Sequence, residues 1–149
     1  NSIYPTSKAA IEEIIQGMIG CLDEVANEKI GKPLKTKQNI TFESRFSHNS
    51  LGDFKNNILG VQNAYLGKIS NGAASENSIG SLVAKADPQL DRQVQQEITT
   101  AIAALDAIPN PIEPKISTSE TTTKMQSAQQ AIQTLFETLE GRVLPIVKG

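Results

Sequence analysis

Apolar residues recur along the chain at alternating steps of three and four positions, the spacing of one face of an α-helix. Four segments carry this pattern, at residues 7–28, 51–66, 87–108 and 117–139. Their apolar stripes are Ile11-Ile15-Met18-Leu22-Val25, Leu51-Phe54-Ile58-Val61-Tyr65, Val94-Ile98-Ala101-Leu105-Ile108 and Met125-Ala128-Ile132-Leu135-Leu139. A shorter apolar group, Ile79, Leu82 and Val83, favours a short helix over 78–86. The pattern therefore predicts four long helices and one short one.

Capping and breaking residues set the expected helix boundaries. Side chains that can cap a helix stand at the start of each long segment: Thr6 or Ser7 after Pro5, Ser50 with Asp53, Asp87 with Pro88, and Ser117 with Glu120. Gly31 and Gly67 are expected to end the first and second helices. The prolines at 109, 111 and 114 predict an extended connector, and Pro145 should stop or kink the last helix.

These elements favour an all-α fold in which residues 1–149 form a single helical-bundle domain. Because each apolar stripe needs an apolar partner, the expected architecture is an antiparallel four-helix bundle with one extra short helix. Residues 32–49 then form a long loop between the first two helices. A helical solenoid is the main alternative, but no repeat of roughly 30 to 45 residues is visible in the sequence.

Composition narrows the chemistry that the chain can perform. With one cysteine (Cys21) and one histidine (His48), the chain cannot form an internal disulfide or a site built from several imidazoles or thiolates. The formal charge is −2 and the basic residues are dispersed, which argues against nucleic-acid binding. No apolar run approaches the ~20 residues of a membrane span. Because the chain starts at Asn1 without a basic and apolar leader, we expect a mature or truncated piece.

The loop at residues 32–49 is longer than most connections between helices, and loops of this length in compact domains are usually functional or disordered. Phe42 and Phe46 are expected to anchor it against the bundle. Such anchoring would carry the polar side chains of the loop to the start of the second helix. Those side chains are Glu43, Arg45, Ser47, His48 and Asn49.

The residues of this loop raise two possible kinds of site, a metal site and a serine nucleophile. Glu43, His48 and Asp53 form a mixed ligand set that suits iron or zinc, although an ion pair, a solvated histidine and a helix-cap carboxylate explain the same residues. Ser47 or Ser50 beside His48 does not predict a nucleophile, because a strand, turn and helix context is missing. We favour the structural interpretation of these residues over a self-contained metal site.

The block at residues 43–67 is similar to the second half of the imelysin family of bacterial cell-envelope proteins, especially lipoprotein-like members from Bacteroidetes. The matching positions are Glu43, Phe46, Ser47, Asn49, Ser50, Asp53, Gly60, Asn63, Tyr65 and Gly67. Further matches are Ser81-Leu82-Val83, Asp87-Pro88 with Leu90-Asp91, Ala107-Ile108-Pro109 and Leu144-Pro145. The resemblance covers nearly the whole chain.

The resemblance implies a two-lobed helical protein of the periplasm or outer membrane that is connected with iron acquisition. The metal motif of the family, Gly-x-His-x-x-Glu, belongs to its first lobe and is absent here, because His48 follows Phe46-Ser47. We therefore expect this chain to be the C-terminal half, with no catalytic or metal-ligating residues of its own. Iron or zinc would be held only together with the missing lobe.

On this interpretation the residues that face a ligand or the other lobe are Glu43, Arg45, Ser47, His48, Asn49, Asp53 and Asn63. The expected partners are the N-terminal lobe of the same protein and components of iron or haem uptake. The preferred function is that of a binding module. The alternatives are the C-terminal half of a metallopeptidase whose metal lies in the missing lobe, and a purely structural scaffold.

Overall fold

The computed structural model describes residues 6–69 and 72–149, and these residues form helices joined by turns and loops, without strands. Pro5, which precedes the expected first cap, lies outside the described residues. The long helices are α1 (Ser7–Asp23), α3 (Ser50–Leu66), α5 (Pro88–Asp106) and α6 (Ser119–Thr138). The short predicted helix is present as α4 (Ile79–Ala86), so the expected all-α fold class is confirmed.

The sequence predicted that the first helix ends at Gly31, and this prediction is wrong. The helix continues from α1 through a π-helical segment, Glu24–Ile30, into α2 (Gly31–Thr36). A π-helical segment shifts the backbone hydrogen bonds by one residue, and here it precedes Pro33, which has no amide hydrogen to donate. The predicted loop at 32–49 is therefore shorter, and the connection begins at Lys37, whose left-handed backbone (φ 56°) caps α2.

The last helix has the same arrangement, a π-helical segment followed by a short α-helix, and it continues beyond Pro145. After α6 the chain forms a second π-helical segment, Leu139–Val143, and then α7 (Leu144–Lys148), which contains Pro145 in its first turn. Pro145 has no amide hydrogen to donate, and the π-helical segment before it changes the register of the backbone hydrogen bonds, as the one before Pro33 does. Pro145 therefore does not stop the helix.

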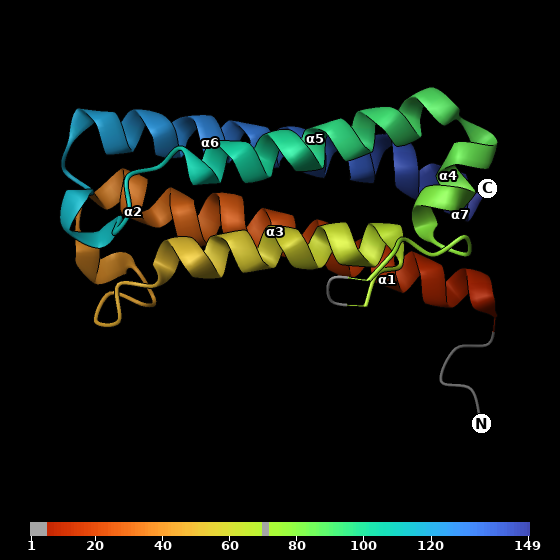
Figure 1. Cartoon of the computed structure of the whole chain (residues 1–149), viewed down its shortest axis with the longest axis horizontal. Coiled ribbons are helices and arrows are strands. Elements are labelled where there is room, and N and C mark those ends of the chain that lie inside the picture. Colours follow the sequence, from red (N-terminus) through yellow and green to blue (C-terminus); the bar gives the residue numbers. More distant parts are fainter. Residues whose placement is uncertain (1–5, 70–71) are drawn as a thin grey trace.

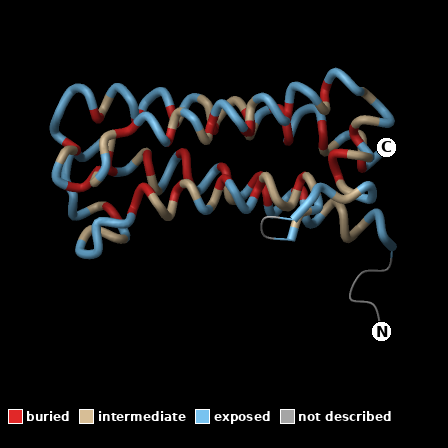
Figure 2. The backbone as a smooth tube through the Cα atoms, viewed as in Figure 1, coloured by how far each residue is buried: buried red, intermediate tan, exposed pale blue. Residues whose placement is uncertain are grey.

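The four long helices pack around a shared core (Figure 1). Helix α1 contacts α3 and α6, and α5 contacts the same two helices from the other side, while α4 packs on α5 and α3. Successive long helices run in opposite directions, which is compatible with the predicted antiparallel bundle. The residues of the four stripes are buried in this core, except Ile11, which is only partly buried (Figure 2).

The bundle has two distinct ends (Figure 1). At what we call the loop end lie residues 37–49, the first turn of α3 and the 3-10 turn Glu113–Lys115. At what we call the pocket end lie the start of α1, the end of α3, α4 and α7. The connections at the loop end include a second 3-10 turn, Asn39–Thr41. Each end has its own candidate site.

Candidate functional site

The carboxylate of Asp53, in the first turn of α3, organises the loop end. Its Oδ2 accepts a hydrogen bond from the Ser44 hydroxyl, and its Oδ1 accepts one from Asn49 Nδ2 at 3.0 Å. Both donors belong to the loop, so Asp53 ties residues 44–49 to the helix that follows them. Its negative charge also lies near the N-terminus of α3, where the helix dipole favours an anion.

The cap of α3 differs from the one expected for Ser50 with Asp53. The backbone N–H of Ser50 donates to Glu113 Oε1 at 2.9 Å, and Glu113 lies 63 positions away on the 3-10 turn Glu113–Lys115. Ser50 and Glu113 are both buried, and Ser50 Oγ and Glu113 Oε2 have no partner among the described residues. A buried carboxylate from another element therefore satisfies a free amide of α3.

Glu43 is exposed and forms an ion pair with Lys29, its Oε2 lying 3.9 Å from the ammonium. Lys29 is largely buried, its side chain 15% exposed, and it also donates to Asn57 Oδ1 at 3.3 Å and lies 4.0 Å from Glu24. Lys29 thus links the loop to the π-helical segment Glu24–Ile30 and to α3. This pairing is the structural interpretation that the sequence favoured for Glu43.

The two phenylalanines of the loop behave differently. Phe42 is buried and its ring lies 6.4 Å from that of Phe54, so it anchors the loop as expected. Phe46 is 87% exposed, and its predicted anchoring role is wrong. Arg45 lies over the Phe46 ring at 4.6 Å and donates to the Ile40 carbonyl at 2.8 Å. Ile40 is itself 57% exposed.

The remaining loop residues of the predicted site are Ser47, His48 and Asn49, and all three are exposed. His48 adopts a left-handed backbone conformation with φ 53°, which turns the chain toward α3. The Ser47 hydroxyl donates to the Ser44 carbonyl at 3.3 Å rather than to the imidazole. Asn63 lies farther along α3, about 15 Å from Asp53 at a rise of 1.5 Å per residue.

The described residues do not supply a metal site of their own. No three His, Cys, Asp or Glu side chains among them are grouped so that they could hold an ion. Both oxygens of Asp53 already accept hydrogen bonds, and Glu43 is paired with Lys29. The loop end of this chain therefore does not fit a resident metal by itself.

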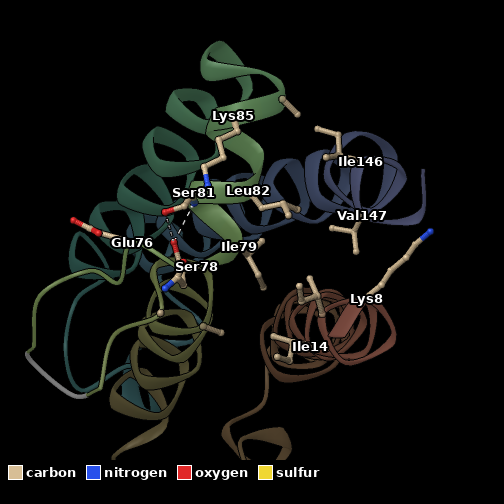
Figure 3. A pocket seen from close by; sticks show the side chains of 15 residues that line it. Lys8, Ile14, Glu76, Ser78, Ile79, Ser81, Leu82, Lys85, Ile146 and Val147 are labelled. Atoms are coloured by element: carbon tan, nitrogen blue, oxygen red, sulfur yellow. Dashed lines mark hydrogen bonds between the residues drawn. The ribbon is translucent and has the colours of Figure 1, made fainter. Parts of the chain in front are cut away.

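A pocket of about 910 Å³ opens at the pocket end, a region that the sequence did not single out (Figure 3). Its apolar lining comes from α1, α3, α4 and α7, and includes Ile14, Ala64, Ile79, Leu82 and Val147. Because four elements that are distant in the sequence form the pocket, no short stretch of sequence predicts it.

Tyr65 connects α3 to α5 beside this pocket. It is fully buried, and its hydroxyl donates to Asp91 Oδ1 at 2.8 Å. Burial, with the Asp91 carboxylate as the second cause, strongly raises the pKa of the Tyr65 phenol, so this phenol stays protonated and keeps donating.

Cys21 is half-buried in a second groove between α1 and α3, and burial raises the pKa of its thiol.

Comparison with known proteins places the chain in a family. The model of Peptidase M75, described as imelysin, matches residues 2–139, so the chain belongs to the imelysin family. It is 42% identical over 148 residues to the Iron-regulated protein A of Synechococcus elongatus, an alignment that covers 99% of this chain and 41% of that protein.

Two crystal structures have the same fold. One is an imelysin peptidase from Bacteroides ovatus, with a TM-score of 0.82 and 28% identity over 97% of this chain and 42% of that one. The other is described as a putative iron-regulated protein A precursor from Parabacteroides distasonis, with a TM-score of 0.79 and 30% identity over 95% and 41% of the two chains. This chain spans about two fifths of the length of these relatives.

A helix that crosses a membrane must be both long and apolar. None in the described ranges 6–69 and 72–149 has both the length and the hydropathy that crossing a bilayer needs.

Proposed function

We propose that this chain is the C-terminal lobe of a longer, two-lobed cell-envelope protein that takes part in iron or haem acquisition. Its loop end faces the other lobe and lines a cleft shared with it. The observation that carries this proposal is the exposure of Phe46, which is 87% accessible on a loop that is otherwise held in place. The relative named Iron-regulated protein A supports the connection with iron.

The exposed apolar groups of the loop argue for a covering partner. Phe46 and Ile40 both present apolar surface to water. Arg45 contacts both residues, because its guanidinium lies over the Phe46 ring and donates to the Ile40 carbonyl. Clustered exposed apolar side chains mark interaction sites more often than isolated ones do. Aromatic residues and arginine are also the residue types that dominate binding energy at interfaces.

Hydrogen bonds at the loop end support the view that its surface is ordered before a partner binds. Asp53 holds Ser44 and Asn49, and Glu113 holds the N-terminus of α3. A loop ordered before binding loses less conformational entropy when its partner docks. Glu43, Arg45, His48 and Asn49 then supply hydrogen-bonding and charged groups that orient ligands held by the other lobe.

The proposal is tested in the longer protein, with its N-terminal lobe and this chain expressed separately and mixed. We expect the two parts to associate, and we expect Phe46→Ser to weaken association at least tenfold. Ile69→Ser is the matched control, because Ile69 is 89% exposed and follows the other end of α3. Equal effects of both variants, or no association of the unaltered parts, would overturn the proposal.

The same preparation separates binding from catalysis. Iron binding by the combined lobes should weaken when Glu43, Arg45 and Asp53 are all replaced by alanine. Chelator-sensitive cleavage of a denatured protein by the combined lobes would instead support the metallopeptidase alternative, for which the imelysin peptidase of Bacteroides ovatus is the structural relative.

A further inference from the structure

Helix α4 presents a mixed polar and apolar face to the pocket. Ser78, Ser81, Leu82 and Lys85 line the pocket, and their spacing of three, four and seven positions places them on one side of the helix (Figure 3). The Ser78 and Ser81 hydroxyls lie 3.1 Å apart and are hydrogen bonded to each other. Facing this helix across the pocket, Ile14 of α1 and Val147 of α7 supply apolar surface.

Two lysines, Lys8 and Lys85, line the pocket. Lys85 is exposed and has no hydrogen-bond or ion-pair partner in the described part of the chain. Lys8, on the opposite wall, donates to the Lys148 carbonyl and points away from the pocket in Figure 3. Glu76 lines the pocket too, but its side chain points outward on the far side of Ser78.

The apolar residues around the pocket are unusually exposed for this protein. Ile14 is 48% exposed and Leu82 is 38% exposed, and these are two of the six large hydrophobic residues that remain exposed among those described. Ile11 departs from the buried stripe of its helix at the same place. Apolar surface and a free ammonium therefore meet in one pocket.

We propose that this pocket binds a small amphiphilic carboxylate of the fatty-acid class. The alkyl chain lies against Ile14, Leu82 and Val147, and the carboxylate lies beside the Lys85 ammonium. The pocket volume of about 910 Å³ falls within the usual range of small-molecule sites. This site is separate from the proposed lobe interface, which lies at the other end of the bundle.

The two parts of the ligand contribute differently. Burial of the alkyl chain supplies most of the affinity, because it removes apolar surface of both the ligand and the protein from water. The ion pair with Lys85 is exposed to solvent and therefore weak, so it sets a preference for an anionic head group. The affinity and the head-group preference can then be altered separately.

The test is calorimetric titration of the 149-residue chain with monomeric dodecanoate, below the concentration at which it forms micelles. We expect saturable binding at one site, and binding of dodecyltrimethylammonium at least threefold weaker. Leu82→Glu should weaken dodecanoate binding at least tenfold. Leu59→Glu is the matched control, because Leu59 is also 38% exposed but lies outside the pocket, and it should leave the affinity unchanged.

Lys85→Gln keeps the apolar lining and should remove the preference for dodecanoate over the cationic amphiphile. Lys124→Gln, on the exposed surface of α6, should preserve that preference. The proposal is overturned if dodecanoate binding does not saturate, or if the Leu82 and Leu59 variants behave alike. It is also overturned if the chain binds anionic lipid vesicles but not monomeric dodecanoate, or if Lys85→Gln leaves the preference intact.

Discussion

The two ends of the bundle differ in how their helix ends are held and in which side chains they expose. At the loop end, a residue far along the chain holds the start of a helix, because Glu113 accepts a hydrogen bond from the Ser50 amide, while Phe46 is exposed to water. At the pocket end, a residue close in sequence caps a helix, because Ser78 accepts a hydrogen bond from the Ser81 amide at the start of α4. The loop end therefore presents an exposed aromatic side chain, and the pocket end contains a pocket with apolar walls.

This difference is the basis for proposing a different kind of partner at each end. A projecting surface that carries an aromatic ring and several charged groups fits another protein surface. A hollow with apolar walls and few polar groups fits a small molecule. Substitutions confined to one end test this contrast.

The largest expected effect is at the loop end. Glu113→Ala removes the acceptor of the Ser50 amide and leaves a small cavity, so it should lower the free energy of unfolding by about 3 kcal/mol. Urea denaturation measures this change. Glu13→Ala on the exposed face of α1 is the control and should change stability by less than about 0.5 kcal/mol. Equal stability of both variants would show that Glu113 does not hold α3.

A smaller effect is expected at the pocket end, at the glycine that ends α3. Gly67 has φ +62°, and a Cβ there would lie 2.9 Å from Ser75 Cβ. Gly67→Ala should therefore destabilise the chain by about 1–2 kcal/mol. Gly60→Ala is the matched variant on the same helix, with open space around the added methyl. It should stabilise by roughly 0.5–1 kcal/mol, because alanine favours helix. Destabilisation by both would show that α3 is constrained along its whole length.

Apolar periodicity was sufficient to predict the fold class and most of the core. The stripe of α3, from Leu51 to Tyr65, is buried as expected, and Asp87 with Pro88 starts α5 as expected. These features depend on residues a few positions apart. The extension of the first helix past Gly31 was missed, because the π-helical segment before Pro33 has no local sequence signature.

The candidate sites were less predictable because distant residues build them. The cap of α3 comes from Glu113, 63 positions away, so the local pair of Ser50 and Asp53 suggested the wrong acceptor. The loop residues Glu43 and Arg45 were identified, but their partners Lys29 and Phe46 became clear only in three dimensions. The pocket is formed by parts of four elements, and the sequence gives no sign of their proximity.

The central claim is that the loop end faces the rest of a longer protein and the pocket end does not. Amide hydrogen exchange tests it directly, by comparing this chain alone with the same residues in the longer protein. We predict at least tenfold slower exchange at residues 44–49 in the longer protein, with little change at residues 79–86. Slower exchange at 79–86 with residues 44–49 unchanged would contradict the claim.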